Sequence, residues 1–140
     1  MNEAVQLFDE GFVCSQAIFA TYCDEYGLER NIALKIANGF GGGIARKQEI
    51  CGVVSGAIML IGLKYGKTES SDSKAHENTY RIINYYCERF IERNHSTNCC
   101  ELLGGDLRNA NEKGLFGTLC RKYVKDSAEI IEILLADNKI

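Results

Sequence analysis

The chain contains no proline, and this absence limits its fold more than any other feature of the sequence. Proline ends or kinks a helix, so long helices can continue here unless another residue interrupts them. The 14 glycines supply those interruptions instead. No segment shows the strict alternation of apolar and polar residues that is typical of a strand. The sequence therefore predicts an all-α fold.

Helical spacing of apolar residues predicts where these helices lie. They are expected over residues 3–9, 14–26, 29–38, 51–65, 72–94, 98–104 and 126–136. Segment 51–65 is apolar nearly all round, which is typical of a buried helix. Gly52 and Gly56 lie four residues apart on it, a spacing that lets a neighbouring helix approach closely. We expect a compact bundle of about five to seven helices around this central helix, forming one domain over residues 1–140.

Three finer expectations follow from the same pattern. The glycine-rich segment 39–43 is predicted to be a loop, because clustered glycines do not stabilise a helix. The last helix is expected to begin at Asp126 or Ser127, either of which is a favoured N-cap residue. One face of helix 72–94 is expected to be buried. It carries Tyr80, Ile83, Cys87, Phe90 and Ile91.

Composition and charge exclude some classes of protein. The net charge of −3 offers no basic surface for nucleic acid or for an anionic membrane. The apolar run from residue 50 to 63 contains glycines and a serine and is too short to span a bilayer. The first residues lack the cationic and apolar segments of a secretory signal. Together with an odd number of cysteines, seven in all, this favours a reducing, cytoplasmic location.

The cysteines divide by their place on the predicted helices. Cys14, Cys51 and Cys99 each fall at or near a helix start, where unpaired N–H groups and the helix dipole stabilise a thiolate. A thiolate is the form of cysteine that acts as a nucleophile or binds a metal. Cys23 and Cys87 instead share apolar stripes with core residues, as small buried hydrophobes do.

Two further cysteines are harder to assign from position alone. Cys100 adjoins Cys99, and neighbours on a helix point about 100° apart, so both are not expected to face one site. Cys120 precedes Arg121 and Lys122, whose positive charges favour a thiolate. No C-x-x-C pair occurs, which argues against a thioredoxin-like dithiol and a zinc ribbon. A shared sulfur site would have to be assembled from distant segments.

Other candidate residues surround these cysteines in the sequence. The glycines Gly41, Gly42 and Gly43, and Gly52 after Cys51, could let backbone approach a cofactor or a thiol, or could simply turn the chain. A phosphate loop is disfavoured, because no strand precedes this segment and no Gly-Lys-Ser/Thr ending follows it. Arg46 is either a charge partner for the thiols or a solvated surface residue. His95 is expected to cap a helix and is a minor candidate for a ligand or base.

Several segments resemble, in order, a family of redox-active proteins with the cysteine pattern C_GCAxxG_C_C. The resemblance rests on residues 11–17 (GFVCSQA), 39–46 (GFGGGIAR), 51–57 (CGVVSGA), 98–104 (NCCELLG) and the late Cys120. It implies a small helical redox domain in which Cys14, Cys51, Cys99 and Cys120 form the family set. Val53 departs from the pattern, since an alanine is usual there.

Three hypotheses for function remain open. In the first, the four thiolates hold an iron–sulfur cluster or another thiophilic metal centre that passes electrons to a redox partner protein. In the second, pairs among the same cysteines exchange thiols and disulfides without a metal, for example Cys14 with Cys51 and Cys99 with Cys120. In the third, the cysteines only pack within a helical interaction module. Monomer and homodimer are equally consistent with the apolar last helix.

Overall fold

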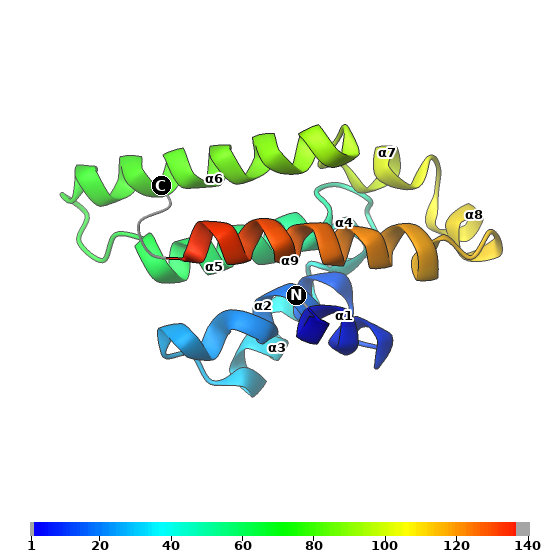
Figure 1. Ribbon diagram of the computed structural model, residues 1–140, viewed down its shortest axis with the longest axis horizontal. Coiled ribbons are helices and arrows are strands. Elements are labelled where there is room, and N and C mark those ends of the chain that lie inside the picture. The colour runs from blue at the N-terminus through cyan, green and yellow to red at the C-terminus, as the bar shows by residue number, and fades with distance from the viewer. Residues whose placement is uncertain (1, 137–140) are drawn as a thin grey trace.

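The computed structural model describes residues 2–136, and it confirms the all-α class (Figure 1). In this range no strand is found, only an isolated antiparallel bridge between Ile50 and Asn98. The predicted domain also includes residues 1 and 137–140, which lie outside the described part. The helices are α1 (Asn2–Asp9), α2 (Cys14–Tyr22), η1 (Cys23–Tyr26), α3 (Arg30–Asn38), α4 (Gly41–Ile44), α5 (Gly52–Tyr65), α6 (Ser73–Asn94), α7 (Cys99–Leu103), α8 (Leu107–Glu112), η2 (Phe116–Cys120) and α9 (Arg121–Leu135).

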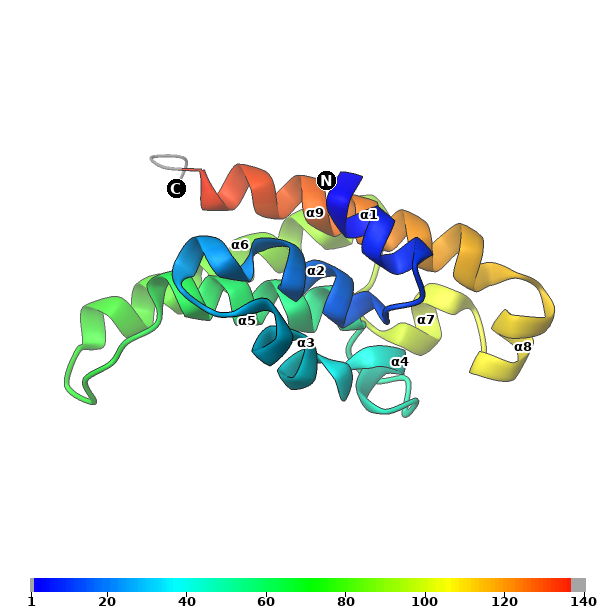
Figure 2. The ribbon, with the colours of Figure 1, turned by 90° about the horizontal axis from the view of Figure 1, so that it is seen from below.

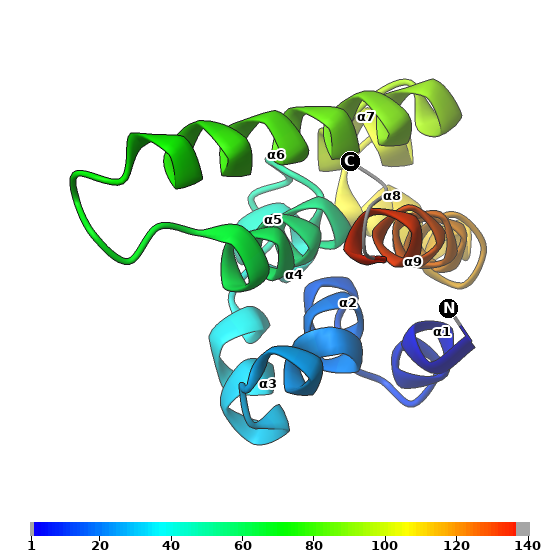
Figure 3. The same ribbon diagram turned by 60° about the vertical axis from the view of Figure 1, so that its left-hand side comes forward.

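Helix α5 is the central helix, as its apolar sequence predicted. It contacts α2, α6 and α9, which surround it in the view of Figure 3. Seven of its residues are buried: Gly52, Val53, Val54, Gly56, Ala57, Leu60 and Ile61. Burying a Val, Leu or Ile side chain contributes about 1.5–3 kcal/mol, so this helix supplies a large part of the core.

The glycine spacing on α5 has the predicted consequence. A Cβ atom at Gly52 would lie 2.5 Å from the Cys14 sulfur, and one at Gly56 would lie 3.0 Å from the carbonyl oxygen of Ser15. The first distance is shorter than real Cβ atoms show, and the second is tighter than most of their contacts, so glycine at both positions allows α2 to pack closely on α5. The same packing brings the first residue of α2 against the first turn of α5.

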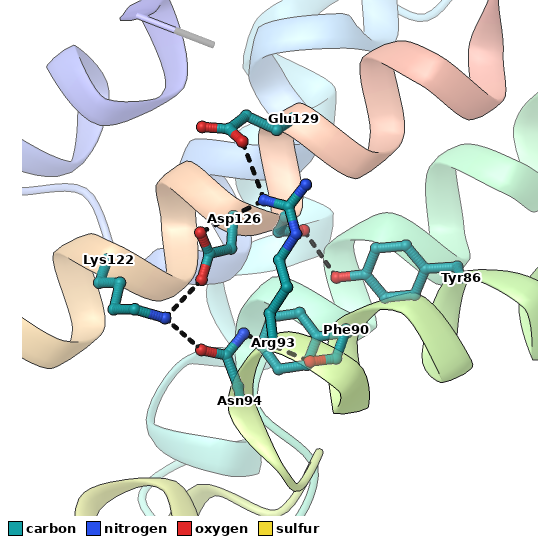
Figure 4. A network of polar contacts seen from close by, with 8 residues as sticks. Tyr86, Phe90, Arg93, Asn94, Lys122, Asp126 and Glu129 are labelled. Atoms are coloured by element: carbon teal, nitrogen blue, oxygen red, sulfur yellow. Dashed lines mark hydrogen bonds and ion pairs between the residues drawn. The ribbon is translucent and has the colours of Figure 1, made fainter.

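Polar contacts join helices α6 and α9 to each other (Figure 4), and Tyr86 and Ser127 also join them to α5. The Tyr86 hydroxyl is 2.7 Å from Ser127 Oγ, and Ser127 donates to the carbonyl of Val53 at 3.1 Å. Nearer the surface, Arg93 contacts Glu129 at 2.8 Å and Asp126 at 3.4 Å. These contacts set the relative positions of the three longest helices.

The N-terminal helices form a layer beneath them, with α1 lying along α9 (Figure 2). Ser15 is fully buried and donates to the carbonyl of Ala37 at 2.7 Å, which ties α2 to α3. On α3, Ala33 and Ala37 are buried, whereas Ile32 and Ile36 are about half exposed. None of the helices in residues 2–136 has the length and apolar character of a segment that crosses a bilayer.

The predicted start of the last helix is wrong, and one short helix was not predicted. The last helix begins at Arg121 rather than at Asp126 or Ser127, because the preceding turn, η2, runs directly into α9. Ser127 is buried inside the helix instead of capping it. The short helix α8 was not predicted at all, since its six residues are mostly polar and carry no clear apolar stripe.

The buried face of α6 is also displaced from the predicted one. It consists of Thr79, Ile82, Tyr86 and Phe90, so only Phe90 belongs to both sets. Tyr80 is 55% exposed and Ile91 is 42% exposed. Aromatic and apolar residues occur all around this helix, and the contact with α5 and α9 selects the face through Tyr86.

Candidate functional site

The four cysteines of the predicted set line one cavity of about 540 Å³. Cys14 is the first residue of α2, Cys51 is the N-cap of α5, and Cys99 is the first residue of α7. These three positions match the helix starts expected from the sequence. Cys120 is the last residue of η2 and leads directly into α9. The cavity therefore lies where four helical segments begin.

Two of these cysteines are held together by a short stretch of paired backbone. The Cys51 N–H donates to the carbonyl of Thr97 at 2.8 Å, and the Cys99 N–H donates to the carbonyl of Glu49 at 2.6 Å. These bonds flank the bridge between Ile50 and Asn98. Residues about fifty positions apart in the sequence are thus fixed side by side.

The cavity lies between two packed clusters. Cys14 and Cys51 pack with the main core, whereas Cys99 and Cys120 pack with a smaller cluster built on Leu103 and Ala110. Leu119 contacts both clusters. Each side of the cavity therefore contributes two thiols.

The Cys14 sulfur receives an unusual set of hydrogen bonds. The Cys51 thiol bonds to it, and so do the backbone N–H groups of Gly42, Ser15 and Gly52. The hydrogen bond from Cys51 is the main cause of a lowered Cys14 pKa. Burial raises the Cys14 pKa, but the bond from Cys51 and the three N–H bonds together outweigh it. A lowered pKa means that Cys14 is the thiol of this site that ionises most readily.

The other three thiols are shifted in the opposite direction. The Cys51 pKa is raised well above its usual range, first because its thiol bonds to the Cys14 sulfur and then because it is buried. Burial, with the nearby charge of Cys14, raises the pKa of Cys99 to about 11 and that of Cys120 to about 12. The four thiols are therefore unequal, and the thiolate form is favoured more at Cys14 than at the other three.

The segment that supplies the Gly42 N–H is a left-handed turn. Five consecutive residues, 42–46, have positive φ, from 49° at Ala45 to 70° at Arg46. Although α4 spans part of this segment, its Gly42 and Gly43 are not right-handed helical, in keeping with the predicted loop. The Gln48 and Glu49 N–H groups close the turn on the carbonyls of Gly42 and Gly43.

The glycines of this turn also make room for the thiols. A Cβ at Gly43 would lie 2.7 Å from the Cβ of Cys99, and one at Gly41 would lie 2.7 Å from the Cβ of Val13. Helices α4 and α7 are accordingly in contact, as Figure 2 shows. All of the predicted residues Gly41, Gly42, Gly43, Arg46 and Gly52 line the cavity.

The remaining cysteines and the histidine candidate lie elsewhere. Cys23 is fully buried in the core, Cys87 is half-buried on α6, and Cys100 is exposed. None of them lines the cavity among the described residues. His95 ends α6 as its C-cap with a φ of 72°, and it too lies outside the cavity lining.

Sequence reasoning missed several residues of the site. The Gln48 side chain donates to the carbonyl of Gly105 at 2.8 Å, and its hydrogen bonding toward Cys99 partly offsets the effect of burial on the pKa of that thiol. Most of the cavity wall is apolar, with Phe8, Phe12, Leu102, Leu107, Phe116 and Tyr123 among its residues. No local pattern marks them, because they come from several separate elements. For Gln48 the sequence offers no signal beyond its position three residues before Cys51.

The placement of the thiols bears on the metal hypothesis. Within residues 2–136, no three His, Cys, Asp or Glu side chains lie close enough together to hold a metal ion. Cys14 and Cys51 affect each other's pKa through a hydrogen bond, whereas Cys99 and Cys120 are linked to Cys14 only through charge. As arranged, the four cysteines do not fit a single metal ion, and we derive no step through one.

Comparison with known proteins agrees with the cysteine pattern. An uncharacterized protein of Archaeoglobus fulgidus is 26% identical over 146 residues, which cover 99% of this chain and 94% of that protein. No solved structure matches the chain. The family described as "Putative redox-active protein (C_GCAxxG_C_C)" matches residues 12–134, nearly the whole chain. The chain therefore belongs to the C_GCAxxG_C_C family.

Proposed function

We propose that the protein carries out thiol–disulfide redox chemistry, with Cys14 as the attacking thiolate and Cys51 as the resolving thiol. The observation that carries the proposal is the placement of both thiols at one cavity: a Cβ at Gly52, the residue after Cys51, would lie 2.5 Å from the Cys14 sulfur, and the Cys51 thiol is the main cause of the lowered Cys14 pKa. Two cysteines placed together at the wall of an open cavity form a dithiol ready to become a disulfide.

The surroundings of Cys14 suit a nucleophile. Three backbone N–H groups bond its sulfur, and it begins α2, where the helix dipole stabilises negative charge. Cys14 is half-buried and lines the cavity, so a small molecule can reach it. Attack by a thiolate on a disulfide depends on both ionisation and access, and this position offers both.

The reaction balances with these two residues. The Cys14 thiolate attacks one sulfur of a substrate disulfide, forms a mixed disulfide, and releases the other substrate sulfur as a thiolate. The Cys51 thiol then gives up its proton to that leaving group, and its sulfur attacks Cys14. This closes a Cys14–Cys51 disulfide and releases the second substrate thiolate. The substrate is reduced by two electrons, and the protein dithiol is oxidised by two electrons.

Thiol counting tests the proposal. One equivalent of a diazenedicarboxamide oxidant is expected to remove two free thiols, dithiothreitol to restore them, and peptide mapping to find Cys14 joined to Cys51. Cys51→Ala is expected to block this bridge, whereas Cys87→Ala, a half-buried cysteine outside the cavity, leaves it intact. Unchanged thiols, or a bridge that excludes Cys14, would contradict the proposal.

The pH dependence gives a second readout. The rate at which Cys14 reacts with a neutral disulfide is expected to rise with pH, with a midpoint below that of an ordinary thiol, because the Cys14 pKa is lowered. In Cys51→Ala this midpoint is expected to move to higher pH, since the hydrogen bond that lowers the Cys14 pKa most is lost. A midpoint that does not move would count against the role of Cys51.

The metal-bound centre predicted from the sequence is the alternative that the same preparations can test. Protein purified without oxygen would then be coloured and contain iron and sulfide. Replacing Cys99 or Cys120 by alanine would remove the metal. That result would replace the dithiol proposal, because the four cysteines would act together as ligands.

A further inference from the structure

The charge of the cavity points to a class of substrate, given the function proposed above. Among the described residues that line the cavity, Arg46 is the only Lys or Arg, and no Asp or Glu is present. The chain as a whole carries a net charge of −3, so the cavity differs in sign from the average surface. The rest of the wall is largely apolar.

Arg46 has no partner of its own within the described residues. Other arginines are paired: Arg93 with Glu129, and Arg121 with Asp9. For the Arg46 side chain no hydrogen bond or ion pair is found in residues 2–136. It is exposed, so it borders the cavity at the protein surface. A guanidinium without a partner beside a substrate cavity is available to bind a carboxylate.

The left-handed turn places Arg46 and a hydrogen-bond donor to Cys14 close together. The side chain of Arg46 lies close to Gly42, where a Cβ would be 3.2 Å from its Cγ. Gly42 is also the residue whose N–H bonds the Cys14 sulfur. One turn of backbone therefore carries both the donor to the thiolate and the cation at the edge of the cavity.

We propose that the cavity binds a small disulfide that has an apolar body and a carboxylate, with the carboxylate held by Arg46 and the sulfur presented to Cys14. A volume of about 540 Å³ is that of a site for a small molecule. The apolar wall recognises the body of the ligand, and the single cation recognises its charge. A neutral disulfide lacks the second contact and binds less well.

Two chromogenic aromatic disulfides test this difference. 5,5′-Dithiobis(2-nitrobenzoate) carries a carboxylate on each ring, and 4,4′-dithiodipyridine is neutral. The rate of each is measured at low ionic strength, and the phase that is absent from Cys14→Ser is assigned to Cys14. The measured quantity is the ratio of the two Cys14 rates, carboxylate probe over neutral probe.

Arg46→Gln is expected to lower this ratio by about fivefold, the size expected for an ion pair near the surface. Arg46→Lys, which keeps the positive charge, is expected to retain most of the wild-type ratio. The matched control is Lys47→Gln, which removes the neighbouring positive charge from a residue that does not line the cavity and is expected to leave the ratio unchanged. Salt is expected to reduce the ratio in the wild type and to have less effect in Arg46→Gln.

The outcomes separate this inference from the proposed function. If Cys14 reacts with neither probe, the dithiol function itself is wrong. If Cys14 reacts with both probes but Arg46→Gln leaves the ratio unchanged, only the carboxylate inference is overturned. The same conclusion holds if Arg46→Gln lowers both rates equally. If Lys47→Gln lowers the ratio as much as Arg46→Gln does, the effect belongs to the general surface charge, and the inference is again overturned.

Discussion

Gly52 shows how one missing side chain shapes the site. A Cβ at this position would lie 2.5 Å from the Cys14 sulfur and 3.1 Å from both the Phe40 carbonyl oxygen and the Ser15 nitrogen. Its own N–H is one of the bonds to the Cys14 sulfur. Gly52 therefore lets the thiolate approach the first turn of α5 and supplies a donor once it is there.

Gly52→Ala is expected to push the Cys14 sulfur away from its donors. The free energy of unfolding should fall by about 1–3 kcal/mol, as in other overpacked cores. The reaction of Cys14 with 4,4′-dithiodipyridine at pH 7 should slow, because a thiol with fewer hydrogen bonds ionises less. Urea unfolding and the rate of this reaction measure the two effects.

Gly62→Ala is the matched control on the same helix. A Cβ at Gly62 would meet nothing within 4 Å, so no clash is expected. Alanine should instead stabilise the helix by about 0.5–1 kcal/mol and leave the Cys14 rate unchanged. If both glycine variants behaved alike, the close approach at Gly52 would not matter to the thiol.

The left-handed turn over residues 42–46 is the element on which the site depends most. Left-handed backbone costs about 1–2 kcal/mol for each residue that carries a side chain, and here Ile44, Ala45 and Arg46 bear that cost. Backbone bonds such as that from the Ala45 N–H to the Gly39 carbonyl, 2.9 Å, hold the turn in place. Strain of this kind persists only where the surrounding structure imposes it.

Ala45→Gly is expected to relieve part of this strain. Ala45 is exposed with a φ of 49°, so its side chain contributes cost and little packing. The free energy of unfolding should rise by about 0.5–1 kcal/mol. This is the strain energy that glycine removes, minus the entropy cost of ordering a residue that is more flexible in the unfolded chain. Thermal and urea unfolding provide the measurement.

The control for this prediction is a variant whose stability is expected to change in the opposite direction. Ala75→Gly, in the first turn of the right-handed helix α6, should lower stability by about 0.5–1 kcal/mol. If Ala45→Gly destabilised the protein as much as Ala75→Gly does, the left-handed conformation at Ala45 would be wrong.

In the molecule as a whole, the three longest helices meet beside the cavity. Tyr86 of α6 is fully buried and contacts Ser127 of α9, and both side chains contact the Val53 carbonyl of α5, at 3.3 Å for Tyr86. Val53 lies in the first turn of α5, two residues from Cys51. The contact that joins the bundle is therefore next to the site.

Tyr86→Phe is expected to lower the free energy of unfolding by about 1–2 kcal/mol, because a buried hydrogen-bonded hydroxyl is lost while Ser127 keeps its bond to Val53. Tyr80→Phe on the same helix removes a hydroxyl from an exposed ring and should change stability by less than about 0.5 kcal/mol. Urea unfolding of both variants measures the difference. Equal losses of stability in the two variants would show that the buried Tyr86 hydroxyl does not stabilise the packing of the three helices.

Local sequence signals were sufficient to predict the fold class, the central helix and several helix starts. The absence of proline and the apolar run around Leu60 predicted an all-α bundle with a central helix, and both are confirmed. Helix starts at Cys14, Cys51 and Cys99 were predicted because glycines and apolar spacing mark helix boundaries locally. Where local signals were weak or misleading, as at Asp126 and along the outer faces of α6, the predictions were wrong.

Which thiols come together, and what surrounds them, depends on how the helices pack. The placement of Cys14 with Cys51, the hydrogen bonding of Gln48 toward Cys99, and the position of Arg46 beside the cavity all join residues on separate elements. No periodicity within one segment encodes such distances, because they depend on how closely whole helices pack. That packing is set by glycines such as Gly52, whose effect appears only when α2 lies against it.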